Sequence, residues 1–132
     1  MEIVDYGFQK AGMWELWPRI RSGVRFVLEA LADERVVYAF DVDGVPKYIG
    51  VCEGSDTTLA DRMNRYKSMA GAGQNRRVAG EIHKALGAGR AVGIHALKPD
   101  EGFVFKGLPV DLVKGLENPL LQAFAPEWNL RT

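Results

Sequence analysis

The sequence predicts an α+β domain with a small, mostly antiparallel three-stranded sheet and flanking helices, in the order β-β-α-α-β-α. Two segments rich in β-branched and aromatic residues, 36–40 and 47–52, are joined by Asp43-Gly44, a pair typical of tight hairpin turns. Two stretches with helical apolar spacing follow, then one alternating segment and a last helical stripe. A hairpin, two helices, one returning strand and a closing helix are typical of an α+β domain with a small, mostly antiparallel sheet.

Length and composition indicate one globular domain spanning 1–132. A chain of 132 residues buries roughly 65–70% of its unfolded surface, enough for a core. The apolar fraction of 47% and the charged fraction of 26% are those of an ordinary globular protein. The 17 basic and 17 acidic side chains cancel, which argues against a purely electrostatic nucleic-acid binder but allows a local basic face.

Cysteine usage and hydropathy narrow the class of protein further. Cys52 is the only cysteine, so a disulfide framework and a thiolate zinc site are excluded. No apolar run reaches the ~18 residues of a membrane span, and the first residues lack the basic n-region of a signal peptide. We therefore expect a cytoplasmic protein without a membrane partner.

The aromatic-rich leader of residues 1–34 is interpreted as an N-terminal extension that packs on a core formed by residues 35–132. Its apolar residues between positions 20 and 31 fit both a helical spacing and a strand alternation, and periodicity alone does not separate the two. Covering the main core is a better explanation of its aromatic side chains than stacking on a ligand.

The middle of the chain predicts two helices, a strand and a loop. Thr58 with Asp61 three residues later fits a capping box, so the first helix begins after Thr58. A second helix is expected at about 75–86, and residues 91–97 alternate as a third strand. Residues 98–108 are expected to form a loop with at most a brief extended piece.

Pro119 interrupts the helical stripe of the last segment. Proline costs ~3 kcal/mol in a helix interior but is tolerated in a first turn. We therefore expect a short helix near 110–115 and a main helix that begins at about Asn118. Glu117 would then lie near a helix N-terminus, at the edge of the core.

Several short motifs, taken together and in this order, resemble those of the GIY-YIG nucleases. They are Val36-Val37-Tyr38, Tyr48-Ile49-Gly50, Leu59-x-x-Arg62, Glu117 and Pro126-x-Trp128-Asn129. The match covers about residues 36–131, and the leader resembles that of small standalone bacterial members. Val36 replaces the glycine that begins the family's first motif, a change that keeps the tyrosine and suits a strand.

The resemblance implies a divalent-metal-dependent endonuclease that hydrolyses DNA phosphodiester bonds. It implies that Tyr38 acts as the general base or relays the proton of the attacking water, that Tyr48 positions this water or the phosphate, and that Arg62 clamps the phosphate. Glu117 would be the sole protein ligand of one Mg²⁺ (or Mn²⁺) ion. Without the resemblance, both tyrosines are better explained as core aromatics, Arg62 as a solvated helix residue and Glu117 as an acidic residue near a helix start.

Two further residues join the catalytic set through the same resemblance. Asn129 would orient neighbouring groups by hydrogen bonds. An equal alternative is that it only anchors the C-terminal segment. Tyr66 lies one helical turn after Arg62, where family members place a histidine or tyrosine. His83 and His95 lack the spacing of zinc ligands, and His83 is better explained as an ordinary helix histidine.

Basic residues gather beside the expected site. Residues 57–90 contain seven basic and two acidic side chains, a surplus of five positive charges. We assign nucleic-acid backbone contacts to Arg65, Lys67, Arg76 and Arg77, with a solvated helix face as the alternative.

The alternative function is a non-catalytic nucleic-acid-binding or assembly module that retains the nuclease fold. DNA is the expected partner, with RNA as an open alternative. The chain offers little surface for base readout, so weak sequence preference or recognition of DNA structure is expected unless a homodimer or a partner protein supplies more. The catalytic hypothesis requires Tyr38, Tyr48, Arg62 and Glu117 to converge around one cleft, and it fails if Glu117 lies across the sheet from Tyr38.

Overall fold

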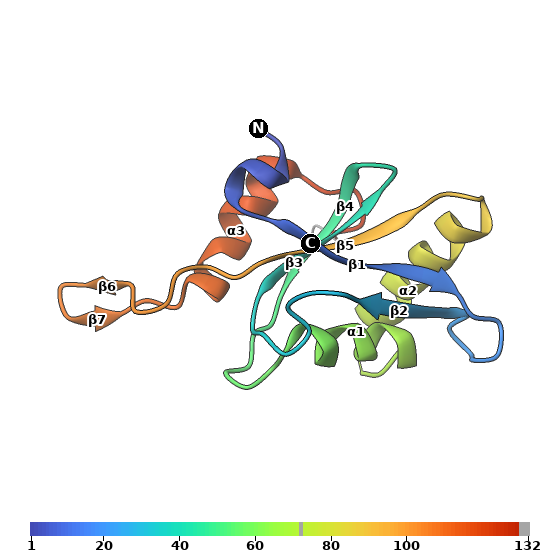
Figure 1. The fold of residues 1–132 in the computed structure, drawn as a ribbon, viewed down its shortest axis with the longest axis horizontal. Helices are drawn as coiled ribbons and strands as arrows, with labels where there is room; N and C mark the ends of the chain where they lie inside the picture. The colour runs from blue at the N-terminus through green and yellow to red at the C-terminus, as the bar shows by residue number, and fades with distance from the viewer. Residues whose placement is uncertain (72, 130–132) are drawn as a thin grey trace.

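The computed structural model, which describes residues 1–71 and 73–129, has a five-stranded antiparallel sheet with helices on both faces (Figure 1). Its elements are η1 (Ile3–Tyr6), β1 (Gln9–Leu16), β2 (Val24–Leu28), β3 (Val37–Val42), β4 (Val45–Val51), α1 (Leu59–Ser68), α2 (Gly73–Gly87), β5 (Val92–Leu97), β6 (Val104–Phe105), β7 (Leu108–Pro109) and α3 (Leu112–Phe124). The strand order is β2-β1-β5-β3-β4, and all neighbours in it are antiparallel. None of the helices described is long and apolar enough to cross a membrane.

The α+β class is confirmed, but the prediction of a three-stranded sheet is wrong. The leader supplies β1 and β2, and β1 pairs with β5 from Gln9 to Trp14. Trp14 and Val24 are buried in the same core as the central strands. The strand alternation of residues 20–31 therefore prevails over their helical spacing, because β2 pairs with β1 and a helix could not complete the backbone hydrogen bonds of β1.

The hairpin and the first helix form as predicted. Asp43 and Gly44 both adopt positive φ, as the tight turn between β3 and β4 requires, and the Gly44 N–H donates to the Asp41 carboxylate at 2.8 Å. At the start of α1, Thr58 Oγ1 accepts from the Asp61 N–H at 3.2 Å. The Thr58 N–H donates to the Asp61 carboxylate at 3.0 Å, which completes the capping box.

Successive residues of the central strand β3 belong to two separate cores. Tyr38 and Phe40 pack toward α1 and α2, whereas Val37 and Ala39 pack toward α3 and η1. Figure 1 shows α3 with η1 on one side of the sheet and α1 with α2 on the other. The helix that carries Arg62 and the helix that carries Glu117 therefore cover opposite faces.

The last helix runs without interruption through Pro119, so the predicted break before Asn118 is wrong. Val113 and Leu120 are buried on the sheet on either side of the proline, and this packing holds both halves in one helix. Pro119 has no N–H, so the carbonyl of Gly115 loses its helical hydrogen bond. Gly115 is exposed, and water can therefore supply the missing donor. Glu117 consequently lies in the middle of α3 and not near its N-terminus.

The segment expected to be a loop with a brief extended piece contains a complete hairpin. β6 and β7 pair only with each other and form a second, two-stranded sheet. Lys106 and Gly107 make its turn, both with positive φ. This hairpin projects from the body of the molecule (Figure 1).

Candidate active site

Three tyrosine hydroxyls meet beneath α1. Tyr38 comes from β3, Tyr48 from β4 and Tyr66 from α1, and none is more than 3% exposed. The hydroxyl oxygens of Tyr38 and Tyr66 are 2.5 Å apart, and the Tyr66 hydroxyl donates to that of Tyr48 at 3.3 Å. Tyr66 reaches this point because α1 turns it inward together with Leu59 and Met63.

Arg62 holds its guanidinium against this cluster. Its Nε donates to the Tyr38 hydroxyl at 3.0 Å and one terminal nitrogen donates to the Tyr66 hydroxyl at 3.0 Å. Burial alone would lower the pKa of Arg62, but its interactions with Tyr38 and Tyr66 outweigh burial, so that the pKa is raised. Arg62 therefore supplies a permanent, half-buried positive charge in a fixed orientation.

A cavity of about 280 Å³ lies beside this cluster, at the outer edge of the sheet. It is lined by Tyr48, Gly50, Val51, Glu53, Arg62, Arg65, Gln74, Asn75 and Glu117. Of the four residues expected to converge, Tyr48, Arg62 and Glu117 line this cavity and Tyr38 does not. α3 covers the face opposite Tyr38, yet Glu117 lines the same cavity as Arg62 because the cavity opens at the edge strand β4. Tyr38 does not line it and is linked to it through Arg62.

Gly50 leaves room for the side chain of Tyr38. A Cβ at position 50 would lie 2.6 Å from both the Cζ atom and the hydroxyl oxygen of Tyr38, a distance that no methyl group tolerates. Gly50 and Tyr38 are directly paired across β3 and β4. The glycine of the Tyr-Ile-Gly motif thus leaves the space that the ring of Tyr38 occupies.

The environment keeps the phenols neutral. Burial is the main cause that raises the pKa of Tyr38 well above its ordinary value, and neighbouring Tyr48 adds to it, while Arg62 opposes it without reversing it. Burial likewise raises the pKa of Tyr48 and of Tyr66. At neutral pH Tyr38 is therefore a hydroxyl that can accept one proton only while it releases another.

Glu117 carries a perturbed carboxyl. Its pKa is raised, first by burial and then by the nearby carboxylate of Glu53, while Arg62 acts in the opposite direction. Within residues 1–71 and 73–129, no three His, Cys, Asp or Glu side chains gather as a metal site. A carboxylate oxygen beside a second carboxylate suits a hard divalent cation, provided that water and substrate oxygens complete its coordination.

Asn129 ties residues 126–129 to the edge strand. Its Oδ1 accepts from the Ile49 N–H at 3.0 Å, and its Nδ2 donates to the Ile49 carbonyl at 2.9 Å. The Trp128 N–H donates to the Lys47 carbonyl at 2.7 Å. Asn129 does not line the cavity, but it holds the strand between Tyr48 and Gly50, which do.

The predicted nucleic-acid contacts lie in different settings. Arg65 lines the cavity, Arg76 is exposed on α2, and Lys67 is half-buried. Arg77 is half-buried and donates to the Trp128 carbonyl, so its guanidinium joins α2 to the chain beside Asn129.

Gln74 and Glu53 are among the residues of the cavity that the sequence did not indicate. Gln74, at the start of α2, donates from Nε2 to the Tyr48 hydroxyl at 2.7 Å and fixes the direction of that phenol. Glu53, in the loop after β4, faces the cavity together with Glu117. Neither residue belongs to a motif that the sequence shows, and only the folded loop and helix start bring them to the site.

No protein-family model and no curated protein sequence matches this chain. The solved structures that are similar to it include two nucleases. A mutant of EndoII from bacteriophage T4 has 22% identity, a TM-score of 0.72, and coverage of 96% of this chain and 94% of that one. The restriction endonuclease HPY188I, solved in complex with product DNA, has 18% identity, a TM-score of 0.58, and coverage of 94% and 79%. The chain therefore has a nuclease-type fold, shared over nearly its whole length with these two proteins.

Proposed function

We propose that this protein is a GIY-YIG-type endonuclease that hydrolyses DNA phosphodiester bonds with the help of a divalent cation. The observation that carries the proposal is the shared cavity of Tyr48, Arg62 and Glu117, with Tyr38 and Tyr66 hydrogen-bonded to Arg62 behind it. A fixed guanidinium, a phenol and a carboxylate facing one space match the needs of phosphodiester hydrolysis, which are an oriented water and neutralised phosphate charge. The similar fold of a restriction endonuclease solved with product DNA supports this assignment.

Arg62 is the proposed phosphate clamp. Two of its nitrogens are held by Tyr38 and Tyr66, so the orientation of the guanidinium is set before substrate binds. A planar guanidinium oriented in this way can present N–H groups to phosphate oxygens, and preorganised donors cost no rearrangement as charge develops.

The tyrosines are the proposed proton path. Tyr48 lines the cavity and can contact the attacking water, and Tyr66 connects its hydroxyl to that of Tyr38. Because burial keeps these phenols neutral, we assign Tyr38 the relay role and not that of a phenolate base. A proton taken from the attacking water at the Tyr48 hydroxyl is balanced by a proton released to the leaving oxygen of the phosphodiester, so that each phenol ends neutral.

Glu117 is the proposed ligand of Mg²⁺ or Mn²⁺, which when bound neutralises phosphate charge and acts as a Lewis acid. The residues present fit such an ion, because the carboxylates of Glu117 and Glu53 repel each other in its absence. Asn129 is a positioning residue that acts through the backbone of Ile49.

Arg65, Lys67, Arg76 and Arg77 remain the proposed contacts to the nucleic-acid backbone. DNA is the proposed substrate, RNA remains open, and a cytoplasmic location remains part of the proposal. Arg65 and Arg76 are exposed, on α1 and α2, and are the two that phosphates reach most readily.

Incubation of purified protein with supercoiled plasmid and Mg²⁺ or Mn²⁺ tests the proposal. We expect nicking by the wild type and its loss in Arg62→Ala and in Glu117→Ala, with unchanged circular dichroism. Glu2→Ala, at the exposed residue that precedes η1, is the matched control and should cut normally. Nicking that persists in Glu117→Ala contradicts the proposal, and salt-sensitive binding without cleavage by the wild type would instead establish the non-catalytic module.

A further inference from the structure

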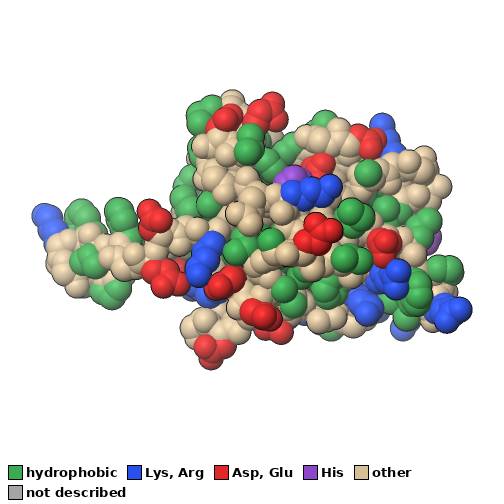
Figure 2. All heavy atoms as spheres, in the orientation of Figure 1, with side chains coloured by type: hydrophobic (Ala, Val, Ile, Leu, Met, Phe, Trp, Pro, Cys, Tyr) green, Lys and Arg blue, Asp and Glu red, His purple; other side chains and the backbone are tan. Residues whose placement is uncertain are grey.

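The projecting hairpin carries a concentration of exposed apolar side chains. We call residues 100–110, which contain β6 and β7, the arm. Five large apolar residues of the arm are 38% to 64% exposed: Phe103, Val104, Phe105, Leu108 and Val110. Figure 2 shows these hydrophobic side chains along an arm that stands away from the rest of the molecular surface.

Such an arm is poorly suited to remain uncovered in water. A single two-stranded hairpin is marginally stable at best by itself, and β6 and β7 pair with no other strand. Together the five side chains expose apolar surface on the order of 500 Å², a patch size that on soluble proteins commonly marks an interaction site. The arm therefore has the properties of a docking element.

The charges of the arm indicate its partner. Lys106 lies at the tip, whereas Asp100 and Glu101 lie at the base, and Figure 2 shows the basic end and the acidic base separated by hydrophobic side chains. Lys106 is the only basic residue of the arm. If two arms lie antiparallel about a two-fold axis, each lysine meets the acidic base of the other arm while the apolar side chains cover one another. DNA fits less well, because the acidic base would face phosphates.

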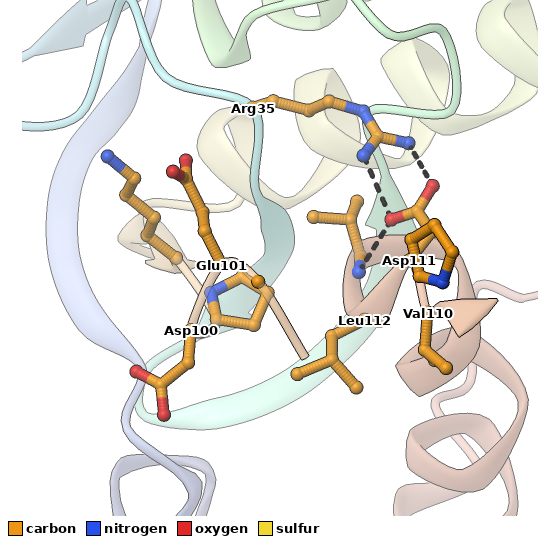
Figure 3. Close-up of a pocket in the computed structure, with 11 residues that line it drawn as sticks. Arg35, Asp100, Glu101, Val110, Asp111 and Leu112 are labelled. Carbon is orange, nitrogen blue, oxygen red and sulfur yellow. Dashed lines mark hydrogen bonds and ion pairs between the residues drawn. The ribbon is translucent and has the colours of Figure 1, made fainter. Parts of the chain in front are cut away.

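A cavity at the base of the arm offers a seat for the opposite tip. It has a volume of about 320 Å³, and its lining includes Pro99, Asp100, Glu101 and Val110 (Figure 3). Two cations also line it, but each is paired: Arg35 with Asp111 and Lys98 with Glu34. Asp100 and Glu101 therefore leave a surplus of negative charge at a concave site that one extended ammonium group could enter. A lysine on a hairpin turn is a chemically matched occupant of an acidic, partly apolar cavity.

The base of the arm is fixed to the body of the molecule. Asp111, the next residue, forms a bidentate ion pair with Arg35 at 2.8 and 2.9 Å, and it also caps α3 through the Val113 N–H (Figure 3). Arg35 in turn donates to the carbonyls of Glu53 and Gly54 at 2.9 Å. The direction of the arm is thereby set relative to α3 and to the loop that carries Glu53.

We propose that the arm is a homodimerisation element, through which two copies of this chain associate about a two-fold axis. Each Lys106 binds the cavity lined by Asp100 and Glu101 of the other copy, and the apolar residues of the two arms form the interface. The buried area would be on the order of 1,000 Å² in total, at the lower limit for a specific interface, so a moderate affinity is expected. This assembly does not depend on the nuclease assignment.

Sedimentation velocity tests the proposal, because it measures mass and does not depend on cleavage. At concentrations on the order of 100 µM, at which a micromolar interface is fully populated, the wild type should sediment as a dimer. Val104→Glu should give a monomer. Val45→Glu is the matched control, since Val45 is the same residue type at 54% exposure against 53% for Val104 but lies in the turn region of β3 and β4, and it should remain a dimer.

A charge exchange identifies the contact. Lys106→Glu should weaken the dimer at least tenfold, because it places like charges at both ends of the interface. The triple variant Asp100→Lys, Glu101→Lys, Lys106→Glu should restore it, since the tip and base are again complementary. A monomeric wild type, a dimer that survives Val104→Glu, or a triple variant no tighter than Lys106→Glu overturns the proposal. If the wild type is monomeric and Val104→Glu instead weakens DNA binding, the arm contacts nucleic acid.

Discussion

Gly50 lies against the hydroxyl end of Tyr38, and no other residue type fits at position 50 without moving that ring. Gly50→Ala should therefore destabilise the protein by about 1–3 kcal/mol, the usual cost of overpacking a core, and should disturb the contacts of Arg62. Urea denaturation measures the first effect and plasmid nicking the second. Gly80→Ala is the control: it lies in α2 with open space around its Cβ, and replacing a helical glycine there should stabilise by up to ~1 kcal/mol. Equal stability of Gly50→Ala and wild type would contradict the close contact between position 50 and the ring of Tyr38.

Tyr66 is the hydroxyl that joins the other two phenols. Tyr66→Phe keeps the ring in the core but removes the partner of Arg62, Tyr38 and Tyr48, so the free energy of unfolding should fall by about 1–3 kcal/mol. Under the proposed function, nicking should slow about 10-fold to 100-fold, less than the ~10²–10⁴ that loss of a direct acid or base costs. Tyr6→Phe, at a 41% exposed site, should change neither quantity.

Glu117 should make stability depend on pH with a definite sign. Its pKa is raised in the folded state, so in the metal-free protein its contribution to stability is complete below the unfolded pKa of about 4.3 and is lost as pH rises through the raised value. Glu117→Gln should therefore melt at a higher temperature than wild type at pH 7, and the difference should shrink as pH falls toward 4. Thermal melts across this range measure it.

The same variant tests the cation without any cleavage assay. Added Mn²⁺ should raise the melting temperature of the wild type, because a ligand that binds only the folded state stabilises it. Glu117→Gln should show little or no rise. An equal rise in both proteins would place the cation elsewhere.

Asp111 performs two separable tasks, the ion pair with Arg35 and the cap of α3. Asp111→Asn keeps a capping side chain and loses the charge, whereas Asp111→Ala loses both. Arg35 is half-buried and Asp111 is exposed, so we expect a loss of up to ~1 kcal/mol for Asn, with about 1 kcal/mol more for Ala. A double-mutant cycle with Arg35→Ala, followed by urea denaturation, isolates the pair, and a coupling energy of zero would show that it contributes nothing to stability.

The sequence predicted the elements whose signals are local. The turn at Asp43-Gly44, the capping box at Thr58 and the strand at 92–97 depend on short-range chemistry and are confirmed. The leader strands were missed as part of the sheet, because the pairing of β1 with β5 joins residues far apart in the chain. The helix through Pro119 was missed for a similar reason, since burial on the sheet outweighs a local propensity.

The candidate site also contains some residues that sequence motifs indicate and others that only the folded structure brings there. The motif residues Tyr48, Arg62 and Glu117 meet at one cavity. Gln74 and Glu53 carry no motif, and their presence follows only from the packing of α2 and of the loop after β4. Tyr38 could be assigned a role from its motif, but its complete burial, which determines that it remains a neutral phenol, is a property of the assembled core.

The amide of Asn129 has a consequence for the solubility of the chain. With Trp128 it occupies the outward-facing backbone groups of Lys47 and Ile49, as a neighbouring strand would. Unpaired groups on an edge strand are templates for strand addition between molecules, the usual first step of β-aggregation. Residues 126–129 thus protect the edge strand from pairing with another molecule. A protein shortened before Trp128 should form amyloid-like aggregates more readily, even where its remaining fold is intact.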